Sequence, residues 1–431
     1  MNNKEVIDRH KPVVLIIGGG FAGINAARAL KHSNVEIILV DRRNHHLFQP
    51  LLYQVATAVI SPAEIAAPLR QLEERQNNLS VVLAEITGID LQARAVEAQV
   101  EGGGKRSHNF DYLIVATGAQ STYFGHDEFA EFAPSLKTLT DAEAMRAKIL
   151  RAYEVAASTE DPFERSRQMT FAVVGGGPTG VELAASLATM ARETLRGNFR
   201  SIDPSQSKIV LIEAGKRILP QFHESLAVKA QEHLERLGVQ VLTNASVEHI
   251  DEQGVVIGGN RVECATVLWG AGVTASPILK MLGAETDRGG RVIVDPNLRV
   301  PGNRNVFVVG DAASIVQDGR PLPGVAQVAI QSGSFAGRVI ASELEGRQMP
   351  KAFSYFNKGN LAVIGKNYAL LERNNVRMSG FFAWIIWALI HIAFLPQLQN
   401  RLRVEVQWLY TYATGKRGSR LIPERPEHRH A

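Results

Sequence analysis

The sequence VVLIIGGGFAG, residues 13–23, joins a run of apolar residues to three glycines in the spacing G-x-G-x-x-G. FAVVGGGPTG, residues 171–180, repeats the pattern, and the first glycines of the two stretches are 157 positions apart. In each stretch the apolar run is typical of a buried strand, and the glycines fall where a strand would turn into a helix. These glycines are Gly18, Gly20 and Gly23 in the first stretch and Gly175, Gly177 and Gly180 in the second.

Each glycine stretch is followed by a short apolar run that ends in an acid, Asp41 after VEIILV and Glu213 after KIVLI. In a dinucleotide-binding unit the first glycine allows a tight turn, the second lets the backbone approach a pyrophosphate, and the third lets helix and strand pack closely. The helix N-terminus favours the anion, and the acid accepts hydrogen bonds from a ribose diol. One such stretch could be a purely structural turn, but two complete units predict two bound dinucleotides. A resident flavin and a visiting nicotinamide would make the chain an electron relay.

Two further strand ends carry residues that suit a flavin domain. Residues 112–115 run into Ala116, Thr117 and Gly118, and residues 306–309 end in Gly310 and Asp311. Asp311 could be a helix cap or could hydrogen-bond the ribityl chain of a flavin, and the second interpretation is favoured by the first fingerprint. The order predicts an α/β fold with two Rossmann-like domains, the nicotinamide domain being inserted into the flavin domain. The expected segments are the flavin domain with a connecting helix at 141–157 (1–165), the nicotinamide domain (166–290), the second part of the flavin domain (291–350) and a C-terminal membrane-anchoring region (351–431).

The composition is that of an ordinary globular protein, with 45% hydrophobic and 21% charged residues among 431. The start, MNNKEVIDRHKP, lacks the apolar segment of a signal peptide and the Arg and Ser richness of a transit sequence, so we expect the cytoplasmic compartment. The single cysteine, Cys264, excludes a disulfide framework, a thiolate metal cluster and an internal redox dithiol. No metal site is expected.

The C-terminal region contains FFAWIIWALIHIAFL, residues 381–395, which is apolar except for His391. Fifteen residues make a helix of about 22 Å, too short for a hydrocarbon core of about 30 Å. The segment that follows has helical spacing of apolar residues but also strict alternation over 401–408, so helix and strand both remain open there. Trp384, Trp387 and Trp408 lie in this region beside arginines, a pattern that favours an anchor lying on a membrane surface. A core or dimer-interface helix is the alternative.

The net charge of +4 is concentrated in the same region, because residues 400–431 contain seven Lys and Arg against three Glu. A nucleic-acid-binding protein would place its basic patch on the binding domain, and here the basic segment follows the most apolar one. The charge pattern therefore indicates an anionic membrane surface and no nucleic acid.

These motifs resemble those of the type II NADH:quinone oxidoreductases, bacterial single-subunit enzymes of the two-dinucleotide-binding-domain flavoproteins that do not pump protons. The resemblance spans Val13 to about Leu421. Two of its stretches, FQPLLYQVA and AQVAIQSG, are far more specific than the fingerprints. FQPLLYQVA lies within the longer matching stretch NHHLFQPLLYQVATAVISPAEIA. The other matching stretches are IIGGGFAG, YLIVATGAQSTYFG, VVGGGPTGVELA, LWGAGV, VFVVGDAA and the Trp-rich tail.

The resemblance implies a glutathione-reductase-like flavoprotein that holds FAD non-covalently and passes two electrons from NADH to a membrane quinone, ubiquinone or menaquinone. It implies a peripheral position on the cytoplasmic face of the bacterial inner membrane and is compatible with a homodimer. For FAD the residues implied are Gly18, Gly20, Phe21, Ala22, Gly23, Asp41, Arg42, His46, Gln49, Ala116, Thr117, Gly118, Gly310, Asp311 and Gln327. For NADH they are Gly175, Gly177, Pro178, Thr179, Gly180, Glu182, Glu213 and Gly272.

The resemblance also implies a quinone site with Gln327, Gln331, Pro50 and Tyr53, and catalytic roles for Glu182, Gln327 and Gln331. A four-residue spacing puts the two glutamines on one helix face, where amides can hydrogen-bond a quinone carbonyl without adding charge. Two glutamines on a helix are otherwise usually a solvated face. Glu182 is equally compatible with a first-turn acid favoured by the helix dipole. The proton source for the quinol stays open between Glu182, His46 and solvent.

Two other classes share the expected fold. One is a soluble flavoprotein reductase that donates to a small electron-carrier protein, and the other is an NADH-responsive redox sensor of the apoptosis-inducing-factor type. Both leave the apolar segment at 381–395 without a role. The lone cysteine also separates the chain from disulfide reductases and sulfide:quinone oxidoreductases, which need reactive thiols.

Overall fold

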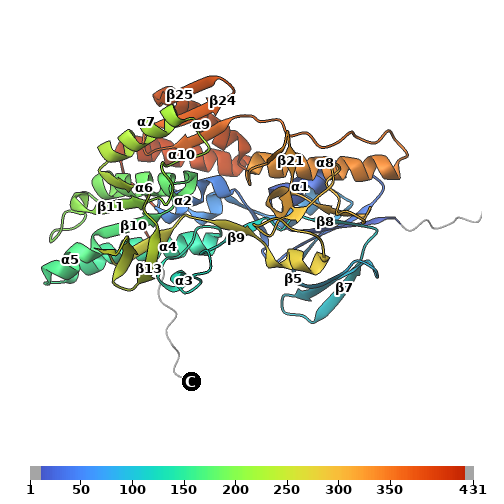
Figure 1. Cartoon of the computed structure of the whole chain (residues 1–431), viewed down its shortest axis with the longest axis horizontal. Coiled ribbons are helices and arrows are strands. Elements are labelled where there is room, and N and C mark those ends of the chain that lie inside the picture. Colours follow the sequence, from blue (N-terminus) through green and yellow to red (C-terminus); the bar gives the residue numbers. More distant parts are fainter. Residues whose placement is uncertain (1–10, 423–431) are drawn as a thin grey trace, which may run out of the picture. The chain divides into compact units, whose positions relative to one another are not determined.

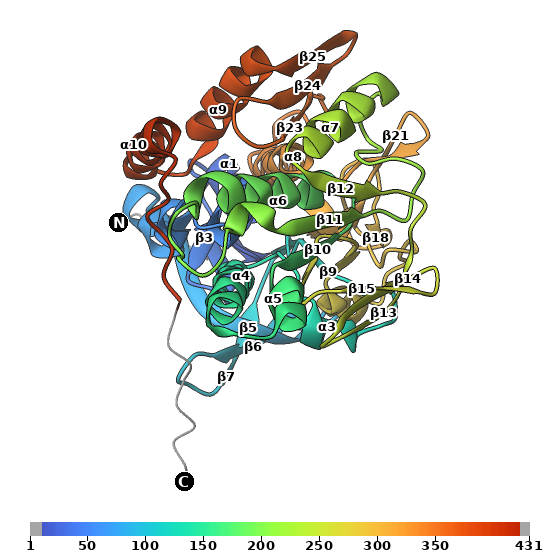
Figure 2. The same cartoon turned by 90° about the vertical axis from the view of Figure 1, so that its left-hand side faces the viewer.

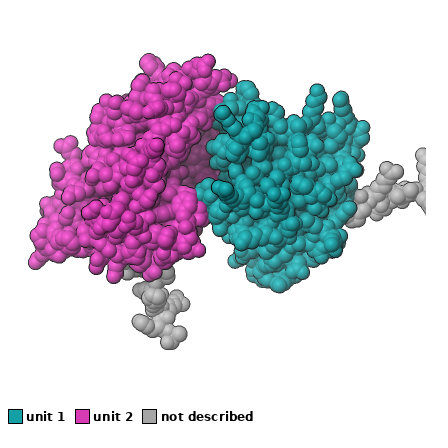
Figure 3. All heavy atoms as spheres, viewed as in Figure 1, with its two compact units in different colours: residues 1–46, 67–120, 273–357 teal, residues 47–66, 121–272, 358–431 magenta. Residues whose placement is uncertain are grey.

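The computed structural model of the chain describes residues 11–422 (Figure 1). The polar start and the last basic residues of the tail therefore lie outside the described residues. The chain divides into two compact units, coloured in Figure 3. Unit 1 contains residues 1–46, 67–120 and 273–357, and unit 2 contains residues 47–66, 121–272 and 358–431. Each unit is described separately.

Unit 1 is built on a seven-stranded sheet. Its parallel part pairs β1 with β2 and β8, so the first apolar run lies at the centre and is buried on both faces. β5 continues into two antiparallel strands with a polar edge. The strand order is β19 (Val306–Val308), β8 (Tyr112–Val115), β1 (Val13–Ile17), β2 (Glu36–Asp41), β5 (Leu79–Asp90), β6 (Ala95–Val100) and β7 (Lys105–Asn109).

Two helices of unit 1, α1 (Phe21–Ala29) and α8 (Ala326–Leu344), lie against each other (Figure 1). A Cβ atom at Gly333 would overlap the backbone of Ala22, and one at Gly337 would lie 2.7 Å from the carbonyl oxygen of Ala26. Glycines four residues apart on α8 therefore bring the two backbones together. The short elements around them are η3 (Leu69–Arg75), η6 (Pro277–Leu282), β18 (Val292–Ile293), η7 (Gly310–Ala312), β20 (Ala313–Ser314), β21 (Val316–Gln317) and β22 (Arg320–Pro321).

Unit 2 contains a second, smaller dinucleotide-binding fold, a parallel sheet in the order β12 (Val239–Leu242), β11 (Lys208–Ile212), β10 (Thr170–Val174) and β16 (Thr266–Trp269). The second apolar run forms β10, whose five residues are all buried. Helices α6 (Pro178–Thr189) and α7 (Glu224–Arg236) flank this sheet, and η4 (Met190–Thr194) continues α6 as a π-helical turn. The same unit contains η5 (Pro204–Gln206) and an antiparallel sheet of β13 (Val247–Asp251), β14 (Gly254–Ile257) and β15 (Asn260–Glu263).

The predicted connecting helix is α4 (Leu139–Ser158). It begins at a capping box in which the Thr138 hydroxyl accepts from the Asp141 amide at 3.1 Å and the Asp141 carboxylate accepts from the Thr138 amide at 2.8 Å. It packs against α2 (Leu52–Ala56) and α5 (Pro162–Gln168). Unit 2 also contains η1 (Gln49–Leu51), η2 (Pro62–Glu64) and α3 (Phe129–Phe132). Where the chain passes between the units it forms β3 (His45–Leu47), β4 (Ala66–Pro68), β9 (Ala119–Ser121) and β17 (Val273–Ala275).

The tail forms a meander of β23 (Asn360–Val363), β24 (Ala369–Arg373) and β25 (Val376–Gly380), followed by the helices α9 (Phe381–Phe394) and α10 (Leu398–Thr414) (Figure 2). Residues 401–408 lie within α10 and are helical. The helix is favoured because it buries one face, which includes Val404, against other parts of unit 2. Asn400 donates to the backbone oxygens of Ala63 and Ala66, which fixes the start of α10. Among the described residues, no helix has the length and apolarity needed to cross a membrane.

The units divide the chain differently from the four expected segments. Unit 2 contains residues 47–66, 121–165 and the tail together with the second fingerprint. The segment of unit 2 that carries this fingerprint ends at residue 272, whereas the expected nicotinamide domain ends at residue 290. The physical reason is that α2, α4 and the tail helices bury their apolar faces on the elements around α6.

Candidate active site

The first fingerprint forms the turn between β1 and α1 in unit 1. Gly18 has φ +108°, and a Cβ at Gly23 would overlap the carbonyl group of Gly18, so only glycine fits either position. Asp41, at the end of β2, accepts from the amide of Gly19 at 2.6 Å and from that of Arg43 at 2.8 Å. The acid thus lies at the turn that a dinucleotide would cross.

The surroundings of this turn fit FAD. Among the described residues, no atom lies within 4 Å of the position of a Cβ at Gly20 and no side chain caps the N-terminus of α1, so a pyrophosphate could approach this end of the helix. The hydroxyl of Thr117 is buried without a hydrogen-bond partner in the fold. A Cβ at Gly310 would lie 3.2 Å from that of Ala22, which brings the end of β19 to the start of α1.

His46 completes this part of unit 1. Its ring lies edge-on to Phe21, with the centroids 5.0 Å apart, and its Nδ1 lies 3.1 Å from the carbonyl oxygen of Gly19. Burial lowers the pKa of His46 to about 4, so the ring is neutral at pH 7. Arg42 is exposed. The FAD candidates from Gly18 to His46, from Ala116 to Gly118 and from Gly310 to Gln327 all belong to unit 1, whereas Gln49 and the quinone candidates Pro50 and Tyr53 belong to unit 2.

The second fingerprint repeats the geometry in unit 2, which contains all eight NADH candidates. Gly175 has φ +106°, and a Cβ at Gly180 would overlap the carbonyl group of Gly175. Glu213 accepts from the amide of Gly176 at 2.5 Å and from that of Gly215 at 2.6 Å, as Asp41 does in unit 1. No atom lies within 4 Å of a Cβ position at Gly177, and α6 begins with Pro178 and has no side-chain cap. This turn therefore fits a second dinucleotide.

Glu182 lies in the second turn of α6, so the first-turn interpretation is wrong. Its carboxylate accepts from the amide of Val363 at 3.3 Å. Burial raises the pKa of Glu182 to about 8, because the one hydrogen bond offsets only part of the lost hydration. Glu182 as a whole residue is half-buried, whereas Tyr53 is buried. Desolvation together with the charge of Glu182 raises the pKa of Tyr53 well above the ordinary value.

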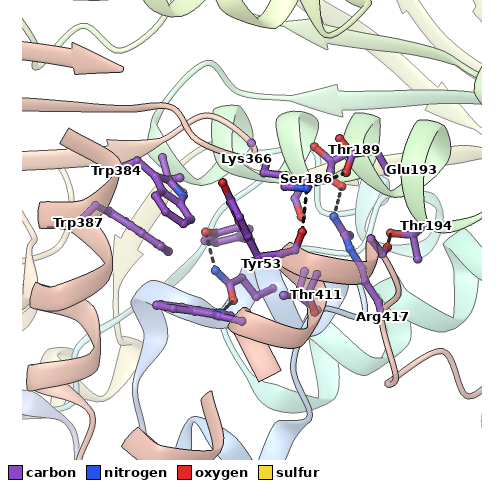
Figure 4. A pocket seen from close by; sticks show the side chains of 17 residues that line it. Tyr53, Ser186, Thr189, Glu193, Thr194, Lys366, Trp384, Trp387, Thr411 and Arg417 are labelled. Carbon is purple, nitrogen blue, oxygen red and sulfur yellow. Dashed lines mark hydrogen bonds and ion pairs between the residues drawn. The ribbon is translucent and has the colours of Figure 1, made fainter. Parts of the chain in front are cut away.

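A cavity of about 110 Å³ opens beside Tyr53 (Figure 4). The Trp408 indole donates to the side-chain oxygen of Gln54 at 2.8 Å, and the Gln54 amide donates to the Tyr53 hydroxyl at 3.0 Å. The Trp387 indole N–H is buried without a hydrogen-bond partner, and its ring stacks on that of Trp408 with the centroids 5.2 Å apart. The cavity is apolar with a small polar network, and it is several times larger than one water needs.

Arg417 lies at the same cavity and is 4% exposed. Its guanidinium donates to the carbonyl oxygens of Thr57 at 2.7 Å and Ser186 at 3.2 Å, and the Thr57 and Ser186 hydroxyls are themselves 2.7 Å apart. Burial lowers the pKa of Arg417 to about 10. The sequence predicts the tryptophans and the basic residues of the tail, Arg417 among them, at a membrane surface, but Arg417 is buried because its guanidinium bonds backbone carbonyls inside unit 2. No role is predicted from the sequence for Gln54. The i, i+3 spacing of Trp384 and Trp387 was the available signal for a shared face.

The two glutamines lie on α8 in unit 1, and their side chains bond the segment that follows that helix. Gln331 donates to the carbonyl oxygen of Phe356 at 3.0 Å and accepts from its amide at 2.9 Å. Gln327 lies 3.4 Å from the hydroxyl of Tyr355. These two bonds leave the Gln331 amide one further N–H and one further oxygen lone pair.

The chain is similar to known proteins over most of its length. Residues 12–333 match the pyridine nucleotide-disulphide oxidoreductase family. The type II NADH:quinone oxidoreductase NdhA of Mycobacterium tuberculosis is 44% identical over 427 residues, which cover 96% of this chain and 89% of that protein. The chain belongs to the type II NADH:quinone oxidoreductases. The second such enzyme of that organism, Ndh, is 41% identical over 96% of this chain and 91% of its own length.

The fold of this oxidoreductase is also that of a solved structure. NDH2 from Plasmodium falciparum, in complex with NADH, superposes with a TM-score of 0.88 at 20% identity, covering 96% of this chain and 100% of that one. The oxidoreductase is thus an α/β flavoprotein with two dinucleotide-binding domains that transfers electrons from NADH to a quinone without pumping protons. Its one cysteine, Cys264, is buried, and burial raises its pKa to about 12. A single buried cysteine leaves no second thiol with which to form an internal redox disulfide.

Proposed function

We propose that unit 1 binds FAD non-covalently at the first fingerprint and that unit 2 binds NADH at the second. The observation that carries the assignment is a hydrogen bond that recurs in both units. The carboxylate of Asp41 accepts from the amide of Gly19, and that of Glu213 accepts from the amide of Gly176. The adenosine ribose of each dinucleotide would replace or share that bond, and the uncapped helix ends would hold the pyrophosphates. The cofactors supply the hydride chemistry, and the chain binds and orients them.

We propose that Tyr53, Pro50, Gln327 and Gln331 contribute to the quinone site. Tyr53 supports this because it lines a cavity that Trp384, Trp387 and Trp408 also line, and the Gln54 amide donates to its hydroxyl there. A phenol and an amide can hydrogen-bond a quinone carbonyl. The cavity is also lined by the charged residues Glu193, Lys366 and Arg417. Gln331 would contribute the N–H and the oxygen lone pair that its two bonds to Phe356 leave available, and those bonds hold its side chain in place.

Glu182 is the proposed proton source for the quinol. With a pKa of about 8 the carboxyl is largely protonated at neutral pH, and it is close enough to Tyr53 for its charge to raise the pKa of that phenol. His46, with a pKa of about 4, holds almost no proton to give at pH 7. Burial favours the neutral form of each group, which is the protonated carboxyl of Glu182 and the deprotonated ring of His46, so it favours Glu182 as the proton donor.

The tail helices are proposed to hold the enzyme peripherally on the cytoplasmic face of the bacterial inner membrane. α9 exposes Phe381, Phe382, Leu389 and Phe394, and α10 exposes Leu398, Leu402, Val406 and Leu409. Exposed apolar side chains on consecutive helices, with arginines among them, suit a lipid surface.

Steady-state NADH oxidation with a water-soluble quinone tests the proposed function. Purified protein is expected to release FAD on denaturation, to oxidise NADH faster than NADPH and to reduce the quinone. Absence of flavin, or reduction of a small electron-carrier protein in preference to the quinone, would contradict it.

A further inference from the structure

Phe124 is a strained and exposed aromatic residue beside the second fingerprint. Its φ is +56°, a conformation that L-residues with bulky side chains rarely adopt, and its side chain is 67% exposed. Such a conformation persists only where the surrounding structure enforces it, and it occurs preferentially at ligand sites. Neither the strain nor the exposure is explained by the core of unit 2.

The loop that carries Phe124 is fixed to the carboxyl end of β16. The Trp269 indole donates to the carbonyl oxygen of Thr122 at 3.0 Å, and the Thr122 amide donates to Gly272 at 3.4 Å. The Thr122 hydroxyl accepts from the Phe124 amide at 3.1 Å. Tyr123, the residue before, is buried, with its ring 4.9 Å from that of Trp269. The exposed ring therefore stands on a rigid base.

Gly272 has the conformation and the small size that bring the Phe124 ring against the backbone. Its φ is +65°, and a Cβ there would lie 2.5 Å from Cζ of Phe124. A side chain at residue 272 would displace the ring. Because Gly272 has no Cβ, the ring of Phe124 can occupy this space.

The position of this ring follows from the order of the strands. Ligands of such sheets lie outside the carboxyl ends of the strands. In the proposed assignment, Glu213 after β11 would bind the adenosine ribose, and the turn after β10 would hold the pyrophosphate. β16 is the next strand on the far side of β10, and a Cβ at Gly175 would lie 2.8 Å from the amide of Ala271. The other half of the dinucleotide therefore extends toward Gly272 and Phe124.

From this arrangement we propose that Phe124 packs against the nicotinamide-riboside half of NADH and fixes its orientation. The proposal rests on the assignment of NADH to the second fingerprint. Phe124 supplies a flat apolar wall that excludes water from one side of the nicotinamide riboside, and it takes no part in proton or electron transfer. An aromatic surface that serves only to cover Trp269, or to contact another protein, is the competing explanation.

Titration calorimetry of the FAD-loaded enzyme with NAD⁺ and with ADP-ribose separates these explanations, because ADP-ribose lacks the nicotinamide. Phe124→Ala should weaken NAD⁺ binding about three- to tenfold, the range expected for loss of one aromatic contact, and leave ADP-ribose binding within about twofold. Phe124→Tyr should restore the NAD⁺ affinity. Phe163→Ala, which removes another exposed ring of unit 2, is the matched control and should change neither affinity.

Equal losses for NAD⁺ and ADP-ribose, or no loss for either, would overturn the proposal. Phe124→Gly removes both the ring and the backbone strain. If the ring had only a structural role, this variant would change the melting temperature and leave the ratio of the NAD⁺ and ADP-ribose affinities unchanged. The assignment of NADH itself is tested separately by Glu213→Lys, which should weaken ADP-ribose binding. If that variant binds ADP-ribose normally, the assignment fails whatever the result for Phe124.

Discussion

The carboxylate of Glu182 accepts a hydrogen bond from the amide of Val363 at 3.3 Å, while the surrounding protein keeps much of its hydration away. This hydrogen bond links α6, the helix of the second fingerprint, to β23, the first strand of the tail meander. A carboxyl held in this way is a neutral acid over most of the physiological pH range.

Glu182 makes the stability of the protein depend on pH. Its pKa is about 8 in the fold against an ordinary value of 4.5, so unfolding releases a proton between these values, and stability should fall as the pH rises from about 4.5 to 8. Glu182→Gln cannot ionise and should lose this part of the pH dependence. Melting temperatures of both proteins at pH 5, 6.5 and 8 provide the measurement. Parallel curves for the two would show that the carboxyl is not desolvated.

The same variant tests the proton source. Quinone reduction by the native enzyme should decline as the pH rises through about 8, whereas Glu182→Gln should be slower at neutral pH and should lack that decline. The rate of flavin reduction by NADH, measured by stopped flow, is the control and should change little. A decline that persists in the variant would assign the proton to another group or to solvent.

Glu213 should make the enzyme prefer NADH over NADPH. At about 4 Å and an effective dielectric of about 20, like charges cost about 4 kcal/mol, an upper limit because solvent screens a half-exposed carboxylate. Arg217 compensates little, since it donates to the carbonyl oxygens of Phe222 and Pro220. Glu213→Gln should narrow the ratio of kcat/KM values for the two cofactors. Equal values in the native enzyme would place the ribose elsewhere.

Asp41 should determine how tightly the flavin is held, and the flavin should be FAD because FMN has no adenosine ribose to meet this acid. Asp41→Ala leaves the buried amide of Gly19 without its present acceptor, a cost of about 1–3 kcal/mol, and removes the ribose partner. The purified variant should carry less flavin per chain. Asp41→Asn retains an acceptor and should lose less. Chromatography of the released flavin measures both the identity and the amount.

The exposed face of α10 should govern membrane association without supporting the fold. Leu402, Val406 and Leu409 are more than half exposed, so changing all three to Glu should release the enzyme from vesicles of anionic lipid and preserve its FAD and its activity with a water-soluble quinone. High salt alone should not release the native enzyme, because apolar burial is not screened. Val404→Ala, in the buried face of the same helix, is the contrasting variant.

Val404 is fully buried, so its truncation should lower stability by about 1–3 kcal/mol and leave membrane binding intact. Deletion of the whole tail should also lower stability, since Trp387, Asn400 and Arg417 pack or hydrogen-bond within unit 2. Vesicle binding that survives the triple Glu substitution would contradict the anchor.

The sequence by itself determined the elements whose local pattern has a single solution. The glycine spacings, the apolar runs before them and the acids after the second strands predicted both dinucleotide folds, because positive φ and the lack of room for a Cβ depend on a few adjacent residues. The helix-forming residues at 141–157 and the apolar run at 381–395 likewise indicated α4 and α9.

Only the tertiary structure decided the features that depend on what packs against a residue. Alternation at 401–408 fits a strand or a helix until Val404 is seen in the core of unit 2. Glu182 is an ordinary helix acid in sequence, and its raised pKa comes from the burial that its neighbours in unit 2 impose. The cavity walls at Tyr53, Trp387 and Arg417 come from segments hundreds of residues apart, and no local pattern records that they meet. Hydration and burial are set by the whole fold, so these properties follow from the folded chain and not from any one stretch of it.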